Sequence, residues 1–445
     1  MNRTALLCAL LLVAALPAVA ADTRIISFEE AMRIALDGNI SLRQAQNSAA
    51  TSKVAVSEAR MQFVPDLRFS TSTSQNFGRS FDESEGRIVN QTSRSASLGV
   101  NSGVTLFDGF ANTASLKQAT LESRASDLDL TRARETVIFT VASNFLALIQ
   151  QQEQLRVRRE SLAAEQALAE QIKTYVNAGS RTVADLYQQQ ANVASAQLTM
   201  VEAERATELA RVDLIDTLHL DPAGIYEFER PADAQLASTG ELPPLDEMLA
   251  RSMDKRSDIE AEEARVAAAE QGVRVARSGY WPDVTLSAGY SSAYTSVSPF
   301  DFAEQLDQRR GGAVGLSLSV PIFDRRSTAN ATRRAELRTQ GERLALESLK
   351  QSIALEVRRV QLDYRAAREQ FSASEAQQRA ADLALQAVQQ RYRAGAATLV
   401  EVSQARASQV QAASSLVSAR YNLLFQRTLA DYYLGELDPA RYATP

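Results

Sequence analysis

The chain has 445 residues, enough for more than one domain, and its formal net charge of −6 is spread along the sequence rather than gathered in one block. There is no basic stripe of the kind that contacts nucleic acid, so we expect no nucleic acid as a partner. A single histidine, His219, and a single cysteine, Cys8, leave little for metal or nucleophilic chemistry. We therefore predict no enzyme activity, no metal and no cofactor.

Residues 1–20 are predicted to be an export signal. Arg3 supplies the positive charge, Ala5 to Ala15 form an apolar run, and Ala18-Val19-Ala20 is a small-x-small cleavage site. Cys8 lies within this segment, so the mature chain is expected to contain no thiol. No later stretch approaches the roughly 18 uncharged apolar residues that a transmembrane helix needs.

Residues 21–222 are predicted to form a structural repeat that begins with a helix. Ser27 followed by Glu30 is a capping box, and the helix that it opens should run to about Met61. No proline interrupts 66–221, and very long helices are therefore possible, because an interior proline costs a helix roughly 3 kcal/mol. The other predicted elements are strands over about 64–78 and 95–107, a helix of roughly 100 Å from Ala111, and a helical tip over about 175–185.

Residues 223–244 are predicted to be a linker, residues 245–439 a second repeat and residues 440–445 a C-terminal tail. The second repeat should open with a helix from about 245 to 279. Its other predicted elements are strands over about 283–295 and 312–323 and a helical tip over about 392–401. The predicted fold class is mainly α with a small β part, built from tandem-duplicated long coiled-coil helical hairpins and four strands per chain.

The duplication rests on anchors that recur at one spacing. FVPD at Phe63 matches YWPD at Tyr280, 217 positions later, and VTLFD at Val104 matches VPIFD at Val320, 216 positions later. The two predicted tips recur at the same spacing. Such agreement is the signature of an internal repeat.

Two apolar periodicities distinguish the helices from the strands. The helical stretches carry apolar residues at steps of three and four, as in coiled coils: Val137, Val141, Phe145 and Leu148. The strands alternate apolar with small or polar residues, as membrane-barrel strands do: Val314, Leu316 and Leu318 against Gly315 and Ser317. The edge of a soluble β-sandwich would show the same alternation. Four strands cannot close a barrel, so membrane strands would imply an oligomer.

The two tips share one local design. Gly179 and Gly395 are suited to the left-handed residue that ends a helix. Thr182 with Asp185 is the signature of a new helix start, and Thr398 with Glu401 repeats it. Each tip is therefore predicted to be the turn of a helical hairpin.

Together these parts closely resemble the TolC family of outer-membrane efflux and type I secretion channels. The Pro-Asp strand openers, the Phe-Asp strand closers and the two tips carry the resemblance, which covers essentially the whole mature chain. The resemblance implies a homotrimer in the outer membrane, with a 12-stranded β-barrel on a periplasmic α-helical barrel. The protein would be a passive conduit for small molecules or a secreted protein. Its implied partners are outer-membrane lipid, a periplasmic adaptor and an inner-membrane pump of the RND or ABC type.

The resemblance also implies roles for tip residues. Residues at the positions of the periplasmic gate are Glu401, Asp185, Tyr392, Tyr175 and Arg181, and those at the adaptor-docking turns are Gly179, Ser180, Gly395 and Ala396. The chain departs from the family pattern at Gln404, where a second acid can stand, and at Ala397, where an arginine is expected. The acids could also serve only as parts of capping boxes, and the glycines only as helix caps.

Two other classes of protein share some of these features. A periplasmic adaptor is also rich in coiled-coil hairpins, but it normally has one hairpin flanked by small β domains. An exported structural coiled coil would not need four amphipathic strands. The order of the elements favours the channel over both.

Overall fold

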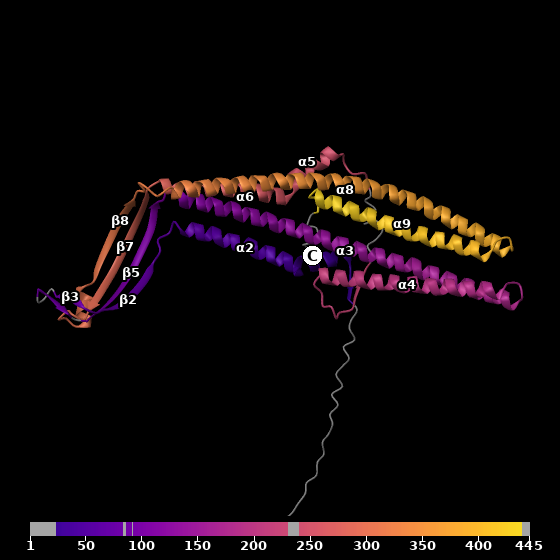
Figure 1. The fold of residues 1–445 in the computed structure, drawn as a ribbon, viewed down its shortest axis with the longest axis horizontal. Coiled ribbons are helices and arrows are strands. Elements are labelled where there is room, and N and C mark those ends of the chain that lie inside the picture. Colours follow the sequence, from indigo (N-terminus) through magenta and orange to yellow (C-terminus); the bar gives the residue numbers. More distant parts are fainter. Residues whose placement is uncertain (1–23, 83–85, 91, 230–239, 438–445) are drawn as a thin grey trace, which may run out of the picture.

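The computed structural model describes residues 24–82, 86–90, 92–229 and 240–437. The predicted signal peptide, the C-terminal tail and residues 230–239 of the predicted linker lie outside this described part. The molecule is elongated, with a β-sheet at one end and the turns of two helical hairpins at the other (Figure 1).

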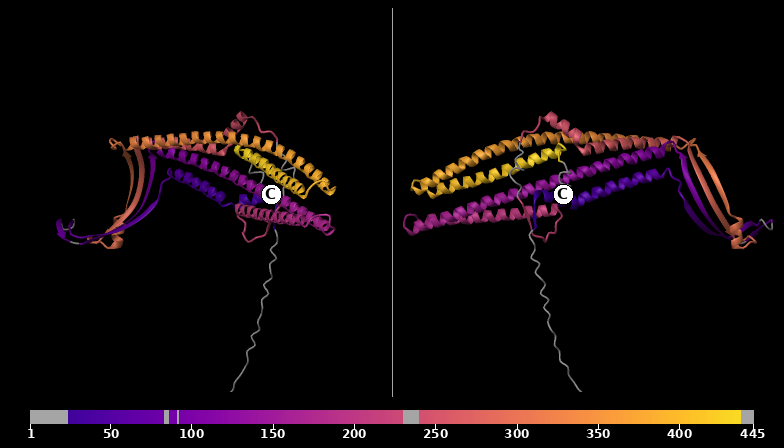
Figure 2. Two further views of the ribbon diagram at one scale, coloured as in Figure 1. Left: turned by 45° about the vertical axis from the view of Figure 1, so that its right-hand side comes forward. Right: turned by 180° about the vertical axis from the view of Figure 1, so that it is seen from behind.

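Two helical hairpins of equal size form most of the molecule. Helices α3 (Ala111–Asn177) and α8 (Ser327–Arg393) each have 67 residues. They turn back into α4 (Val183–Thr217) and α9 (Leu399–Tyr433), which each have 35 residues. The hairpins run side by side in each view of Figure 2, and the sheet bends away from their axis. This pairwise match of lengths is the structural form of the predicted duplication.

The helix that opens each repeat is broken, so the prediction of one continuous helix is wrong in both. The first repeat has α1 (Phe28–Gly38) and α2 (Ile40–Met61), and the second has α5 (Leu245–Lys255) and α6 (Ser257–Arg277). Asn39 is extended, and its side chain accepts a hydrogen bond from the Leu42 N–H at 3.1 Å, which starts a new helix. Arg256 is the extended residue at the second break.

The main sheet joins both repeats. Strands β2 (Arg68–Asn76), β5 (Ser93–Phe107), β7 (Asp283–Thr295) and β8 (Gly311–Ser319) are antiparallel neighbours in the order β2-β5-β7-β8. The β5–β7 ladder is the junction between the first repeat and the second. The outer edges of β2 and β8 have no partner strand within the described part of the chain.

Two strands are shorter than the sequence suggested. The observed β8 ends at Ser319 rather than near 323, where Pro321 has no N–H to continue a ladder. The observed β2 begins at Arg68 rather than near 64. Before it, the Asp66 carboxylate accepts a hydrogen bond from the Gly103 N–H at 2.7 Å, which fixes the approach of the chain to the sheet.

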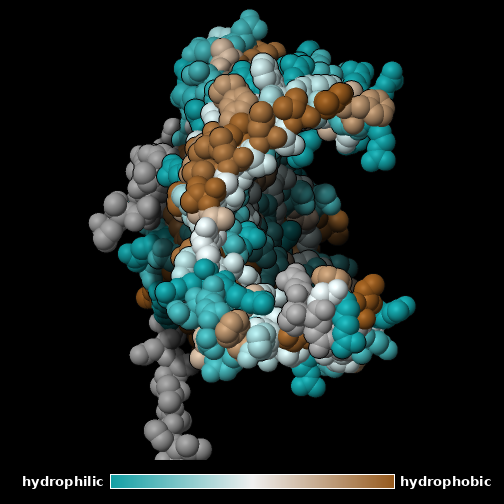
Figure 3. Space-filling model, turned by 90° about the vertical axis from the view of Figure 1, so that its left-hand side faces the viewer, coloured by the Kyte–Doolittle hydropathy of each residue, from teal (hydrophilic) through white to brown (hydrophobic). Residues whose placement is uncertain are grey.

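The register separates the two faces of the sheet by polarity. Val104, Leu286 and Leu316 lie opposite one another in neighbouring strands. The next row, on the other face, holds Gly103, Ser287 and Gly315. Seen from the sheet end of the molecule, hydrophobic side chains form a continuous band (Figure 3). The alternation predicted from the sequence therefore produces one apolar face and one small, polar face.

Short elements that the sequence did not suggest complete the fold. Strands β1 (Arg24–Ile26) and β6 (Tyr226–Phe228) pair in parallel, and β3 (Arg79–Asp82) and β4 (Arg87–Asn90) form a hairpin. A short helix α7 (Phe302–Gln308) lies between β7 and β8, and the 3₁₀ turn η1 (Ser278–Tyr280) precedes β7. The largest apolar core lies where β1, β6 and α1 pack on α3, around the fully buried Phe145. None of the described helices is both long enough and apolar enough to span a bilayer.

The Phe-Asp motifs connect the strands to the long helices: β5 ends at Phe107, whereas β8 ends at Ser319, four residues before Phe323. The Asp108 carboxylate accepts a hydrogen bond from the Asn112 N–H at 2.8 Å, and Asp324 accepts one from Thr328 at 2.7 Å. Because these bonds favour the ionised form, the pKa of Asp324 is lowered. Between aspartate and helix, each repeat places two residues in the left-handed region: Gly109 and Phe110, then Arg325 and Arg326. The motif therefore supplies a sharp turn together with a helix cap.

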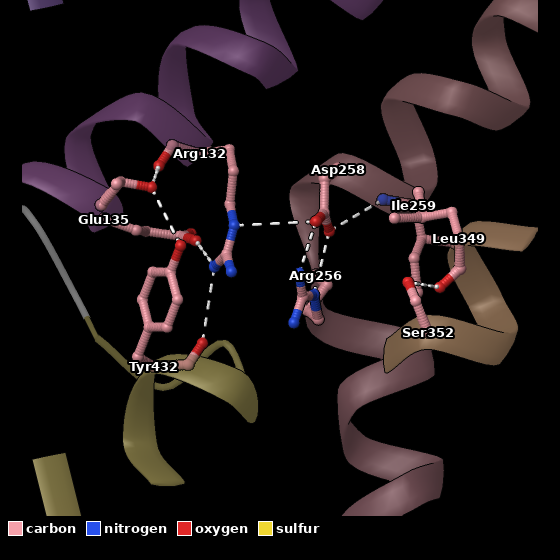
Figure 4. Close-up of polar contacts among 9 residues, drawn as sticks. Arg132, Glu135, Arg256, Asp258, Ile259, Leu349, Ser352 and Tyr432 are labelled. Carbon is pink, nitrogen blue, oxygen red and sulfur yellow. Dashed lines mark hydrogen bonds and ion pairs between the residues drawn. The ribbon is translucent and has the colours of Figure 1, made fainter. Parts of the chain in front are cut away.

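An ion network holds the break between α5 and α6 against α3 and α9 (Figure 4). Arg132 of α3 lies between Glu135, at 2.8 Å, and Asp258, at 3.7 Å. Its guanidinium also covers the Tyr432 ring at 3.9 Å. Arg256 donates two hydrogen bonds to the Asp258 carboxylate, at 3.0 and 2.5 Å. Burial acts to raise the pKa of Asp258, but the arginines outweigh it and the pKa is lowered.

His219 follows the last turn of α4 in a left-handed conformation, with φ of 51°. Its N–H donates to the Asp216 carbonyl at 2.9 Å. Gly435 occupies the corresponding place after α9, with φ of 67°, and a Cβ there would meet the Lys255 backbone at 3.3 Å. The single histidine of the chain thus stands where the other repeat uses glycine to end a helix.

Candidate functional site: the two helical tips

The first tip, between α3 and α4, is closed entirely by local hydrogen bonds. The Ser180 N–H donates to the Tyr175 carbonyl at 2.9 Å across Gly179, whose φ is 73°. This is the Schellman arrangement that ends a helix. Thr182 then caps α4: its hydroxyl accepts from the Asp185 N–H at 3.2 Å, and the Asp185 carboxylate accepts from the Thr182 N–H at 3.3 Å.

The second tip, between α8 and α9, repeats this geometry. The Ala396 N–H donates to the Arg391 carbonyl at 2.8 Å across Gly395, whose φ is 74°. The Thr398 hydroxyl accepts from the Glu401 N–H at 3.2 Å, and the Glu401 carboxylate accepts from the Thr398 N–H at 3.1 Å. Both capping boxes expected from the sequence are therefore present.

The two tips pack against each other through an apolar cluster. Its buried members come from α3 and from both sides of the second tip: Leu168, Ile172, Tyr392, Ala397, Leu399 and Val402. Val176, Leu186 and Val388 add partly buried surface. Ala397 is only 7% exposed, so the position at which the family pattern expects an arginine is here a small residue inside the cluster.

An arginine from the first tip contacts this cluster instead. The Arg181 guanidinium lies over the Tyr392 ring, with its carbon 4.4 Å from the ring centroid. The pKa of Tyr392 is raised, mainly because the side chain is buried. Asp185 and Tyr175 add to this increase, whereas the positive charge of Arg181 opposes it. The Tyr392 hydroxyl has no hydrogen-bond partner in the described part of the chain. The structure thus brings together four of the five residues expected at the gate.

Glu401 has different neighbours. Its carboxylate lies 3.4 Å from the Arg391 guanidinium, on the side of the second tip. Hydrogen bonds from the Thr398 backbone and hydroxyl lower the pKa of Glu401, and Arg391 lowers it further. The group is therefore ionised at neutral pH. Tyr175 accepts a hydrogen bond from the Gln171 amide at 3.0 Å, one turn before the first tip.

A buried polar cluster lies on α3, α4 and α9 near the tips, and it was not predicted from the sequence. Gln189 of α4, which is fully buried, donates to the Glu165 carboxylate of α3 at 2.5 Å. Arg406 of α9, 9% exposed, places its Nε 3.5 Å from the same carboxylate. Asn192 joins the group by donating to the Ser403 hydroxyl at 3.0 Å. Charged and amide side chains thus connect both hairpins at a second level.

A signal for this cluster was available in the sequence. Leu399, Val402, Arg406 and Val410 follow the three-and-four spacing of a buried seam, and so do Leu162, Glu165, Leu168 and Ile172. A charge on such a seam is either paired or strongly destabilising. When two helices each have a charged residue within the apolar stripe, at a similar distance from the tips, the two residues are therefore candidates for a buried pair.

The sequence of the chain also matches a family of known proteins. The family model for outer membrane efflux proteins matches residues 31–218 and 248–429. The chain belongs to this family. The two matched ranges fall one in each repeat, and together they cover most of the chain.

Individual relatives agree with this assignment. The pyoverdine export outer membrane protein OpmQ of Pseudomonas putida is 28% identical over 383 residues, which are 82% of this chain and 77% of the relative. The outer membrane protein TolC of Escherichia coli is 24% identical over 425 residues, 92% of this chain and 83% of the relative. A crystal structure of CusC superposes with a TM-score of 0.80 at 19% identity, covering 92% of both chains.

The predicted family, fold class and location are confirmed. Outer membrane efflux proteins are channels rather than enzymes, so the chain is an export channel of the outer membrane. The two alternatives, a periplasmic adaptor and a structural coiled coil, are rejected by the family match over both repeats. The superposition with CusC covers 92% of both chains, so the two proteins share the combination of a β-sheet and long helical hairpins in one chain.

The buried pair yields a prediction for tip stability. Arg406→Leu leaves the Glu165 carboxylate buried without its cation, which should destabilise the packed tips by about 3 kcal/mol. Hydrogen exchange of the amides in residues 168–176 should then become roughly a hundredfold faster. Arg393→Leu, at an exposed arginine of the same tip, should change little. The Glu165→Leu, Arg406→Leu double variant should recover much of the protection, and unchanged exchange in Arg406→Leu alone would show that the pair contributes nothing.

Proposed function

We propose that the channel works as a homotrimer whose tips form its periplasmic gate and dock a periplasmic adaptor coupled to an inner-membrane pump. The observation that supports the oligomer is the open sheet, whose four strands leave two edges unpaired within the described residues. Backbone groups without partners are costly in lipid, and roughly eight strands are needed for a closed barrel. Three chains would supply 12 strands, with β8 of one copy beside β2 of the next.

Exposed apolar stripes on the helices support the same proposal. Leucines on α8 recur at steps of seven and eleven and are each 50–61% exposed: Leu337, Leu344, Leu355 and Leu362. A second stripe on α4 is 49–60% exposed: Leu198, Val201, Leu209 and Val212. Steps of seven and eleven are those of coiled-coil seams. Neighbouring copies would cover these stripes and complete a helical barrel.

The trimer proposal is tested by mass. Light scattering of the purified channel in detergent should give three chains per particle. Leu355→Asp combined with Leu362→Asp should shift the particle towards single chains, because both charges would fall in the seam between copies. Arg393→Asp, outside the stripe, should leave the trimer intact. A fully active monomer or dimer would refute the proposal.

For the gate, we propose that the Glu401 and Asp185 side chains from three copies surround the periplasmic entrance. Glu401 is partly exposed with a lowered pKa, so it carries its charge at neutral pH. Rings of carboxylates select cations and bind divalent ions. The contact between Arg181 and Tyr392 would hold the two hairpins of each copy in the closed position. The pump and adaptor would open the gate by separating these groups.

Single-channel recording tests the gate. Glu401→Gln keeps an acceptor for the Thr398 N–H but removes the charge, so cation selectivity and divalent block should both fall. Glu369→Gln, a matched change at an exposed site on α8, should leave both unchanged. Arg181→Ser should raise the basal conductance several-fold, because the contact with Tyr392 is worth roughly 0.5–2 kcal/mol. If Glu401→Gln channels keep normal selectivity and block, the role of Glu401 is capping alone.

For docking, we propose that the adaptor contacts the small, exposed turn residues Gly179, Ser180, Gly395 and Ala396. No atom lies within 4 Å of a Cβ built at either glycine, so both turns face open space. A surface of small residues permits close approach by another helical tip, and a bulky side chain would block it.

Cross-linking to the cognate adaptor tests docking. Ala396→Trp should lower both adaptor cross-linking and export by roughly tenfold, because Ala396 lies beyond the capping glycine and its side chain faces outward. Ser408→Trp, an equally bulky change at an exposed site on α9, is the control. Normal cross-linking in Ala396→Trp would mean that the adaptor does not dock at this turn.

A further inference from the structure

The foot of the sheet, where strands β5, β7 and β8 meet the helices, carries a cluster of exposed aromatic residues. We define the sheet foot as residues 107–110, 278–282 and 320–326. Its aromatic side chains are strongly exposed: Phe110 at 64%, Tyr280 at 58%, Trp281 at 57% and Phe323 at 83%. Large apolar side chains exposed in such a cluster mark a contact surface rather than ordinary protein exterior.

The sheet foot continues the apolar face of the sheet. Along β8 and just past it, Val314, Leu316, Leu318 and Val320 are 54–77% exposed, and Ile322 is 96% exposed. Figure 3 shows this hydrophobic band across the sheet end of the molecule. Membrane strands commonly end in a girdle of aromatic residues at the level of the lipid headgroups. The sheet foot is at the helical end of the band, so it corresponds to the periplasmic leaflet of the outer membrane.

Two arginines lie directly after this band. Arg325 and Arg326 are exposed, and neither takes part in an ion pair within the described residues. Arg277 and Arg333, by contrast, both pair with Glu336, at 2.9 and 3.5 Å. The nearest acid in sequence, Asp324, is engaged by the Thr328 N–H at 2.7 Å as a helix cap. The sheet foot therefore presents two cationic side chains that have no ion-pair partner in the described part of the chain.

The turn itself does not require arginine. The corresponding residues of the first repeat, Gly109 and Phe110, adopt the same left-handed conformation, with φ of 66° and 69° against 55° and 64° for the arginines. Glycine fits this conformation without strain, whereas a side chain does not. Strained residues that the fold could replace are often retained for a function. The arginine pair is therefore an addition of the second repeat rather than a demand of the backbone.

We propose that Arg325 and Arg326 bind the phosphate headgroup of an anionic phospholipid in the periplasmic leaflet. Tyr280, Trp281 and Phe323 would lie beside the upper acyl chains of the same lipid. Guanidinium groups suit phosphate because they donate paired hydrogen bonds to its oxygens. In the trimer proposed above, three such sites would alternate around the channel with three uncharged Gly109-Phe110 turns. The proposal deepens the outer-membrane placement of the chain by assigning a lipid class to one position.

The sequence contains its own reporter for the sheet foot. Trp281 is the only tryptophan of the chain and belongs to the sheet foot. Bromine atoms on the acyl chains of a phospholipid quench tryptophan fluorescence only at close range. Reconstitution into vesicles with brominated phosphatidylglycerol or brominated phosphatidylcholine therefore compares the two headgroups at one known place. We expect quenching to show a preference for phosphatidylglycerol on the order of fivefold or more, decreasing as salt is added.

The first repeat supplies the matched variant. Arg325→Gly with Arg326→Phe reproduces the Gly109-Phe110 turn, which this fold already accommodates. The double variant should show equal quenching by the two lipids, with quenching by brominated phosphatidylcholine unchanged. Arg338→Gln removes one charge eleven residues into α8 from its start, roughly 16 Å along the helix, and should keep the preference.

The outcomes separate the lipid site from the membrane placement. Equal quenching by both headgroups in the wild-type channel would overturn the phosphate site, and so would an unchanged preference in the double variant. Absence of quenching by either brominated lipid would instead show that the sheet foot does not face lipid, and would contradict the placement of the sheet in the membrane.

Discussion

The open sheet is the constraint on which the rest of the molecule depends. Strands β2 and β8 have outer edges without a partner strand in the described chain, and one face of the sheet is apolar. Such a sheet is stable in lipid only when its edges are paired, and in the proposed trimer other copies of the chain would pair them. If three sheets closed into a ring, the symmetry of that ring would also fix how the helical hairpins of the three copies are arranged. The exposed stripes on α4 and α8 are the surfaces that such an arrangement would bury.

The duplicated halves share the backbone of their helical hairpins and of several turns, and they differ in the side chains that stabilise these turns. In the first repeat, the Asn39 side chain caps the helix that follows the break. In the second repeat, the residue at the break is the extended Arg256, which is hydrogen-bonded to Asp258. The last turn of the hairpin ends at His219 in one repeat and at Gly435 in the other. Gly109-Phe110 and Arg325-Arg326 have different side chains, yet both pairs form the same left-handed turn. The backbone of this turn therefore does not account for the two arginines of the second repeat.

The hairpins are joined near their tips by interactions of different chemical kinds. The apolar cluster around Tyr392 is non-directional, whereas the contact of Arg181 with its ring and the pair of Glu165 with Arg406 are electrostatic. Apolar packing supplies adhesion, and buried polar pairs select one alignment of the helices because a shifted register leaves charges unpaired. If the tips form the proposed gate, this combination would let them close in one position and still separate.

The sequence by itself determined the elements that depend on local rules. Proline spacing, glycine at Gly179 and Gly395, and the capping pairs led by Thr182 and Thr398 act within a few residues, so the hairpins and their tips could be read directly. Only the tertiary structure decided which tip residues meet, because Arg181 and Tyr392 are far apart in the chain and come together through packing of the hairpins. The same holds for Glu165 and Arg406, whose pairing depends on the relative rotation of α3 and α9. Local patterns fix where helices begin and end, but the rotation of one helix against another is set by all their contacts at once.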